Sequence, residues 1–249
     1  MNSIKKMMLS GALGCLISGM AYADGSSPQP VKPYWQDIQV VAVNKEKPRS
    51  SFMSYADRET ALTSRFEKSP YYSLLNGTWK FFFVDSYKDL PQNITDPSVN
   101  TSSWDDITVP GNWEVQGHGV AIYTNHGYEF KPRNPQPPLL PEANPVGVYR
   151  RDIEIPASWD NRDIYLHIGG AKSGLYVYLN GKEVGYSEDS KNPAEFLINK
   201  YLQPGKNVLT LKIFRWSTGS YLECQDFWRM SGIERDVFLW SQPKASIQY

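Results

Sequence analysis

Residues 175–186, LYVYLNGKEVGY, decide the fold class of this chain. Aromatic and aliphatic residues stand on both sides of Asn180-Gly181, and Asn-Gly between apolar runs is the strongest short-range signal for a β-hairpin. The segment before the turn consists of residue types that favour strands over helices. The stretch therefore predicts two antiparallel strands joined by a tight turn.

Similar apolar runs follow one another on both sides of this hairpin, with turn-forming residues between them. Closely spaced strands separated by turns are typical of sandwiches and barrels, and we find no helical period of useful length and no internal repeat. The sequence therefore predicts an all-β, jelly-roll β-sandwich with long ordered loops. Its main strands are expected at residues 79–84, 148–155, 163–168, 175–179, 184–186, 208–216 and 237–240.

The composition supports a packed domain. The chain has 249 residues, of which 41% are hydrophobic and 14% aromatic, which is enough to fill a core. Lysine and arginine together balance aspartate and glutamate, so the formal net charge is zero. A balanced charge gives no indication of binding to nucleic acid or to an anionic membrane surface.

The first 23 residues have the pattern of a signal peptide. Lys5-Lys6 form a basic region, residues 7–20 are apolar, and Ala21-Tyr22-Ala23 is a small-x-small cleavage signal. The apolar run is too short to be a stable membrane anchor. We therefore expect export to the periplasm or secretion, in preference to lipoprotein anchoring through Cys15, whose preceding residues are a poor processing site. Cleavage would leave Cys224 as the only cysteine, which excludes an intramolecular disulfide.

After the signal peptide, the chain divides into four parts. Residues 24–33 are polar and contain prolines, which is typical of a linker. Residues 34–68 have only a weak hydrophobic pattern and predict an extended amino-terminal arm. Residues 69–245 contain the expected sandwich, and residues 246–249 would begin a following domain.

Residues 214–238, FRWSTGSYLECQDFWRMSGIERDVF, are the main candidate for a functional site. Aromatic rings beside carboxylates and arginines on a loop suit a hydroxyl-rich ligand. A structural corner of ion pairs and packed rings is an equal alternative. A catalytic pair formed by Glu223 and Asp226 is disfavoured, because ion pairing with Arg229 and other nearby charges would hold both acids ionised.

Several other chemistries are excluded by the motifs that the sequence lacks. The chain has no phosphate-binding glycine loop, no dinucleotide fingerprint and no nucleophile elbow. His118, His126 and His167 do not have metal-ligand spacing. His167 lies among apolar residues and is expected to be structural, whereas His126, beside Asn125, is the better candidate for function.

Seven motifs stand in a characteristic order along the chain. They are LNGTWKF at 75–81, VPGNWE at 109–114, IYTN at 122–125, NPVGVY at 144–149, NGKEVGY at 180–186, DSKNPAEF at 189–196 and the run from 215 to 237. Together they resemble the amino-terminal sugar-binding domain of β-galactosidases of glycoside hydrolase family 2. The resemblance covers residues 34–245 and implies a jelly-roll sandwich. In the family, an immunoglobulin-like domain, a (β/α)8 barrel and further β domains follow.

The resemblance also implies which part of a reaction this chain serves. In the family, two glutamates of the barrel carry out retaining hydrolysis of terminal non-reducing β-D-galactose residues. No catalytic residue is therefore expected in this chain, and the chain alone is expected to be inactive. Asn125 and Asp226 match two positions that reach into the active site and bind galactose hydroxyls. Asp226 also matches a ligand of a sodium ion that barrel residues complete, and a magnesium site would lie in the missing barrel.

Each of these two assignments has a structural alternative. For Asp226 the alternative is an ion pair with Arg229, and for Asn125 it is a loop-capping amide. Trp216, Trp228 and the ion pairs of the run are expected to form the scaffold around Asp226. Cys224 and His126 depart from the family pattern, because an acidic and a small apolar residue are expected there. Neither departure removes a matched group.

Three functions remain open on the sequence. The first is the sugar-binding domain of an exported β-galactosidase, with β-galactosides and the family's catalytic domains as partners; a full-length homo-oligomer is compatible with it. The second is a stand-alone carbohydrate-binding protein, and the third is a structural module without sugar contact. A β-glucuronidase or β-mannosidase domain is less favoured, because ECQDFWR at 223–229 follows the galactosidase version.

Overall fold

The structure is built almost entirely from strands. The computed structural model describes residues 32–130 and 134–247, so the expected signal peptide, Cys15 and most of the linker lie outside the described residues. The strands are β1 (Ala42–Val43), β2 (Tyr72–Leu74), β3 (Gly77–Val84), β4 (Asp105–Val109), β5 (Gly111–Asn112), β6 (Ile122–Thr124), β7 (Val146–Glu154), β8 (Arg162–Ile168), β9 (Ala171–Lys172), β10 (Gly174–Leu179), β11 (Lys182–Ser187), β12 (Ala194–Leu197), β13 (Lys206–Phe214), β14 (Phe227–Arg229), β15 (Gly232–Ile233) and β16 (Val237–Pro243).

Helices within the described residues are short. The α-helix α1 (Arg58–Leu62) has five residues, and Asp57 caps it by accepting a hydrogen bond from the backbone N–H of Thr60. Within these residues, no helix is long and apolar enough to cross a membrane. Single 3₁₀ turns are η1 (Tyr34–Gln36), η2 (Phe66–Lys68), η3 (Tyr87–Asp89), η4 (Glu114–Gln116), η5 (Ala157–Trp159), η6 (Asn199–Tyr201) and η7 (Thr218–Tyr221).

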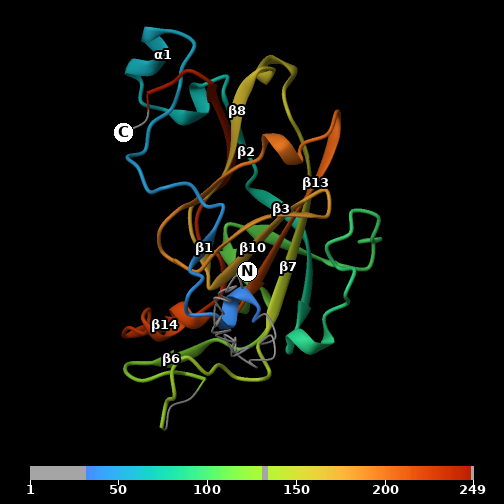
Figure 1. Cartoon of the computed structure of the whole chain (residues 1–249), viewed down its shortest axis with the longest axis vertical. Helices are drawn as coiled ribbons and strands as arrows, with labels where there is room; N and C mark the ends of the chain where they lie inside the picture. The colour runs from blue at the N-terminus through green and yellow to red at the C-terminus, as the bar shows by residue number, and fades with distance from the viewer. Residues whose placement is uncertain (1–31, 131–133, 248–249) are drawn as a thin grey trace, which may run out of the picture. The chain divides into compact units, whose positions relative to one another are not determined.

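Two antiparallel sheets form a sandwich (Figure 1). The seven-stranded sheet has the order β1-β11-β10-β13-β7-β3-β4, and the four-stranded sheet has the order β12-β8-β16-β2. Sequence-distant strands are neighbours in both sheets, as in a jelly roll. A two-stranded sheet, β14-β6, and a three-stranded sheet, β5-β15-β9, complete the described structure. The all-β, jelly-roll prediction is confirmed.

The hairpin at Asn180-Gly181 forms as predicted between β10 and β11. Both turn residues have positive φ, 53° for Asn180 and 78° for Gly181. Asparagine and glycine tolerate this conformation better than other residues, and the turn matches the twist of the two strands. The Asn180-Gly181 pair, which is visible in the sequence, is therefore the local cause of the hairpin.

The main core lies between the facing surfaces of the two large sheets. In β13, Leu209, Leu211 and Ile213 are fully buried, because every second side chain of a strand points to the same face. From the other sheet, Leu166 and Leu239 join the same cluster. Aliphatic burial of this extent stabilises the fold by the hydrophobic effect, at about 25 cal/mol for each Å² removed from water.

The outer faces of both sheets are also covered. On the seven-stranded sheet, the ring of Trp35 stacks on Phe214 with centroids 5.0 Å apart. On the four-stranded sheet, Met53 belongs to a buried cluster with Tyr165 and Trp240. Trp35 and Met53 come from the residues expected to form an extended arm. These residues wrap the sandwich, and β1 adds a strand to the edge of β11.

Candidate functional site

The two predicted sugar-binding residues lie at neighbouring ends of a small ribbon. In the two-stranded sheet β14-β6, Thr124 pairs with Phe227 and Tyr123 pairs with Trp228 in antiparallel register. Asn125 follows Thr124 and Asp226 precedes Phe227, so both leave the ribbon at the same end. Figure 1 shows β6 and β14 side by side. The fold thus brings together two residues that are 101 positions apart in the sequence.

Asp226 carries an exposed carboxylate that the opposite strand orients. The Tyr123 hydroxyl donates a hydrogen bond of 2.7 Å to Oδ1 of Asp226. This hydrogen bond is the main cause of the raised pKa of Tyr123. Within the described residues, Asp226 forms no ion pair, and its Oδ2 accepts no hydrogen bond from a side chain or backbone group. One carboxylate oxygen is therefore held and the other is available to a ligand.

The predicted alternative for Asp226, an ion pair with Arg229, is wrong. The Arg229 side chain points inward, with 2% of its surface exposed, and its Nε lies 3.7 Å from Oε2 of Glu129. Within β14, successive residues project to opposite sides, so Arg229 is buried and Trp228 is exposed, while Asp226 lies in the exposed bend before the strand. Burial of Arg229 therefore leaves the Asp226 carboxylate outside, without a cationic partner.

Asn125 is exposed at the start of the turn that follows β6. Its Oδ1 lies 2.6 Å from Nδ1 of His126, and the Thr124 hydroxyl donates to the backbone carbonyl oxygen of His126 at 2.5 Å. The turn is therefore held by local contacts, and His126 orients Asn125 directly. The amide nitrogen of Asn125 makes no hydrogen bond within the described part of the chain and can serve as a donor to a ligand.

Glu223 does not form a catalytic pair with Asp226. Its two carboxylate oxygens accept hydrogen bonds from the backbone N–H and the hydroxyl of Ser190, at 2.8 and 2.6 Å. Burial raises the pKa of Glu223, and the bonds to Ser190 act in the opposite direction. Glu223 is thus committed to fixing the loop that carries Ser190, in agreement with the sequence argument against a catalytic pair.

The two tryptophans predicted as scaffold differ in burial: Trp216 is buried and Trp228 is exposed. Trp216 is 9% exposed, and its Nε1 donates to Oε1 of Glu129 at 3.0 Å, which fits the prediction. Trp228 is 54% exposed, and its ring lies against Tyr123, with centroids 5.7 Å apart. Trp228 therefore lies on the exposed outer face of the ribbon, where it packs on the residue that orients Asp226.

Sequence reasoning missed Tyr123 and Glu129 as parts of the site. Tyr123 precedes Asn125 by two residues and orients Asp226. Glu129 accepts a hydrogen bond from Trp216 and forms an ion pair with Arg229. Each acts only through a partner from the other strand or loop. Their residue types give no local signal, and only the pairing of β6 with β14 reveals them.

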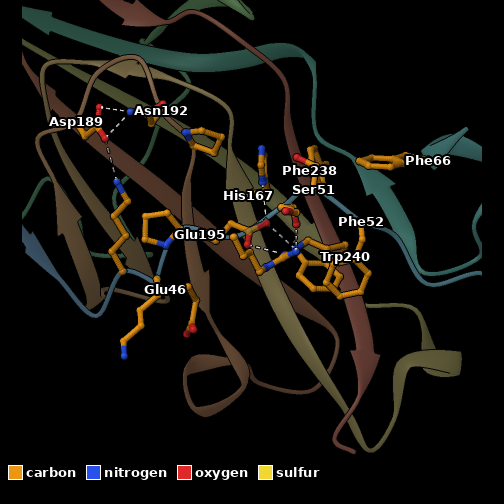
Figure 2. Close-up of a pocket in the computed structure, with 16 residues that line it drawn as sticks. Glu46, Ser51, Phe52, Phe66, His167, Asp189, Asn192, Glu195, Phe238 and Trp240 are labelled. Atoms are coloured by element: carbon orange, nitrogen blue, oxygen red, sulfur yellow. Dashed lines mark hydrogen bonds and ion pairs between the residues drawn. The ribbon is translucent and has the colours of Figure 1, made fainter. Parts of the chain in front are cut away.

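A separate cavity of about 290 Å³ lies between the amino-terminal residues and the four-stranded sheet (Figure 2). At its centre, Glu195 accepts hydrogen bonds from Nη2 of Arg49 at 2.7 Å and from Nε1 of Trp240 at 3.1 Å. Nδ1 of His167 lies 2.8 Å from Oε1 of Glu195, the oxygen that also accepts from Trp240, and the His167 ring stacks on Phe238. His167 is therefore structural, as predicted, and neither Asn125 nor Asp226 lines this cavity.

The Glu195 cluster predicts an acid-sensitive part of the stability. Burial acts to raise the pKa of Glu195, but His167 and Arg49 outweigh burial and lower it below its ordinary value of 4.5. A carboxyl with a depressed pKa stabilises the fold above pH 4.5, and this contribution is lost as the pH falls through its folded pKa. We expect the free energy of unfolding of the wild type to exceed that of Glu195→Gln at pH 7, and the difference to shrink below pH 4.5.

Urea unfolding followed by tryptophan fluorescence between pH 7 and pH 3 measures this difference. Glu154→Gln, at an exposed end of β7, is the matched control and should follow the wild type at every pH. A Glu195→Gln difference that stays constant through the acid range would contradict the assignment.

The described residues hold no group of three or more His, Cys, Asp or Glu side chains that could bind a metal ion. The Oδ2 atom of Asp226 can offer one oxygen ligand to a hard cation.

Comparison with known proteins identifies the family to which this chain is similar. Residues 72–243 match the family model described as glycosyl hydrolases family 2, sugar binding domain. The chain is 40% identical over 218 residues to a β-galactosidase of Priestia megaterium, covering 86% of this chain and 21% of that protein. It is 39% identical over 214 residues to a β-galactosidase of Psychromonas ingrahamii, covering 86% of this chain and 20% of that protein.

Solved structures support the fold. A β-glucuronidase of Bacteroides uniformis shares 24% sequence identity with this chain at a TM-score of 0.52, over 69% of this chain and 18% of that one. At this identity the likeness concerns the fold alone. The chain spans about one fifth of the length of the curated relatives that it matches.

Proposed function

Because the chain belongs to glycosyl hydrolases family 2, through the sugar-binding domain of that family, we propose that it is the amino-terminal domain of an exported β-galactosidase. In this proposal, Asn125 and Asp226 form one wall of a pocket for a terminal β-D-galactose residue. The single observation that carries it is the β6–β14 ribbon, which presents both polar groups at neighbouring, exposed ends.

The chemistry of the two side chains suits a sugar. The Asn125 amide offers a donor and an acceptor to adjacent hydroxyl groups, while the Asp226 carboxylate accepts hydrogen bonds from hydroxyls. The exposed Tyr123 donates its hydroxyl to Asp226, and the exposed ring of Trp228 packs beside Tyr123. In the proposal, the free oxygen of Asp226 also serves as one ligand of a sodium ion, with the remaining ligands from the catalytic barrel.

The bond-breaking step lies outside this chain in our proposal. Retaining glycosidases use two carboxyl groups about 5 to 5.5 Å apart, one as acid and base and one as nucleophile. Glu223 is committed to Ser190, so Asp226 lacks such a partner among the residues described above. The two glutamates, and any magnesium ion, are assigned to the barrel of the complete enzyme. Export is inferred from residues 1–23, which have the signal-peptide pattern.

The proposal predicts that the 249-residue chain by itself binds galactose and lactose weakly, with a dissociation constant in the millimolar range or beyond detection. One wall supplies few of the contacts that a closed pocket would make, and ligand pockets normally bury most of the ligand surface. Isothermal titration calorimetry with both sugars measures the affinity.

Hydrolysis assays of the complete enzyme provide the second half of the test. We expect turnover of a nitrophenyl β-galactoside well above that of the matching β-glucuronide. Micromolar binding by the chain alone would favour a stand-alone carbohydrate-binding protein. Absence of β-galactoside hydrolysis by the complete enzyme would exclude the proposed activity.

A further inference from the structure

Arg229 contacts each of the segments that carry the proposed sugar-binding residues. Its Nη2 donates to the backbone carbonyl of Thr124 at 3.4 Å, directly before Asn125. The same nitrogen donates at 3.0 Å to Sγ of Cys224, two residues before Asp226. One guanidinium group therefore bridges the ends of both segments from the buried side of the ribbon.

The position of Arg229 is itself fixed from three sides. Glu129 faces its Nε at 3.7 Å, and its guanidinium lies over the Phe227 ring, 4.7 Å from the centroid. The backbone carbonyl of Arg229 accepts a hydrogen bond of 3.1 Å from Nη2 of Arg215. Nε and Nη1 of Arg229 form no hydrogen bond among the described residues, so the guanidinium is confined by Glu129 and Phe227 and defines the positions of the two segments through Nη2 alone.

Besides the Arg229 bridge, two side-chain hydrogen bonds join these segments at the end where Asn125 and Asp226 lie: the Tyr123 hydroxyl donates to Asp226, and the Cys224 thiol donates to the backbone carbonyl oxygen of Gly127. The ribbon has three residue pairs, and an isolated two-stranded hairpin is marginally stable. The Tyr123–Asp226 hydrogen bond is exposed and competes with water. Both of those hydrogen bonds are exposed, whereas the Arg229 side chain is buried and contacts both segments, so it constrains the distance between Asn125 and Asp226 from the protein interior.

We propose that Arg229 is a positioning residue for sugar binding, which sets the spacing of Asn125 and Asp226 without touching the sugar. This inference rests on the proposed function, because it assumes that both residues bind the same sugar. Both the charge and the length of the Arg229 side chain matter for this role. Methionine at position 229 would fill similar space but lack the hydrogen-bond donors, whereas lysine would keep the charge and reach less far.

The test compares variants of the complete enzyme acting on a nitrophenyl β-galactoside. We expect Arg229→Met to lower kcat/KM about 10-fold, since a displacement of roughly 1 Å at a site can cost up to about 100-fold. Arg229→Lys should recover part of the loss. In an Asp226→Ala background, Arg229→Met should have less than about a 2-fold further effect, because residues acting through the same group are not additive.

Arg150 provides the matched control. It is also buried, with 5% of its surface exposed, and it donates to the carbonyl oxygens of Ile94, Asp96 and Val99, which belong to a loop without site residues. Arg150→Met should lower the melting temperature and leave kcat/KM unchanged.

The outcomes distinguish failure of the positioning role of Arg229 from failure of the proposed function. A normal kcat/KM for Arg229→Met, while Asp226→Ala is impaired, would overturn the positioning role and leave the proposed function standing. A full additional loss in the Asp226→Ala background would overturn it too. A complete enzyme that is inactive toward β-galactosides, or indifferent to Asp226→Ala, would overturn the proposed function and this inference together. Where Arg229→Met does not fold, Arg229→Lys serves for the same comparisons.

Discussion

Asp226→Ala is expected to lower the kcat/KM of the complete enzyme for a β-galactoside by about 100-fold. Loss of a hydrogen bond to a charged group costs about 1.5 to 3 kcal/mol, and 1.4 kcal/mol corresponds to a factor of about ten in rate. The proposed second role of the carboxylate, as a sodium ligand, places the effect at the upper end of that range. Steady-state kinetics with a nitrophenyl galactoside measures it.

Two further variants make this result specific. Asp85→Ala removes another exposed aspartate outside the ribbon and should leave the kinetics unchanged. Tyr123→Phe removes only the hydroxyl that orients Asp226, so a smaller loss than for Asp226→Ala is expected. Near-normal turnover by Asp226→Ala would show that the ribbon does not bind the sugar.

Glu114→Ala is expected to reduce the free energy of unfolding of the chain by about 3 to 5 kcal/mol, the usual cost of breaking a buried ion pair from one side. The Glu114 side chain is fully buried and lies 3.5 Å from Nη1 of Arg215. Both of its oxygens also accept from the backbone N–H of Ser231, at 3.0 and 2.8 Å. Without Glu114, the buried Arg215 cation and this N–H lose their partner.

Equilibrium urea unfolding measures this loss, and Glu154→Ala on the exposed end of β7 serves as its control, with an expected change within about 0.5 kcal/mol. Because Arg215 also donates to the carbonyl oxygens of Val120 and Arg229, the ribbon should loosen as well. Faster amide hydrogen exchange in β6 and β14 would report the loosening. A destabilisation below about 1 kcal/mol would mean that Glu114 is dispensable.

The candidate site consists of exposed polar groups packed over buried charged side chains. The exposed groups, Asn125 and Asp226, are the ones that we propose to bind the ligand. Beneath them, Arg229, Glu129 and Glu114 are buried charges that connect the ribbon to the sandwich. Buried ion pairs contribute little net stability, but they restrict the ribbon to one arrangement because each partner is costly to leave unpaired.

The sequence predicted the main strands for a local reason. Alternating aliphatic residues in β13 and the Asn180-Gly181 turn are signals that each segment carries by itself. The same kind of reasoning failed for β6 and β14. Each has only three residues, and its pairing partner lies about 100 positions away.

The sequence motifs around Asn125 and Asp226 identified both residues through their resemblance to a family, but residue types alone left Asp226 undecided between a ligand and a partner of Arg229. The structure excludes the pairing with Arg229, because Arg229 projects into the interior toward Glu129, whereas Trp228, its neighbour in β14, projects to solvent. A linear sequence does not state which face of a short strand is covered, because the covering residues come from other segments.

By itself, then, the sequence determined the all-β class, the main strands and the hairpin at Asn180-Gly181, since these depend on contacts within a few residues. The tertiary structure alone decided that Asn125 and Asp226 are neighbours, that Tyr123 orients Asp226, and that Arg229 lies beneath both. Those relations depend on antiparallel pairing between segments that are distant in the chain, and the free energy of such pairing is set by the whole sandwich.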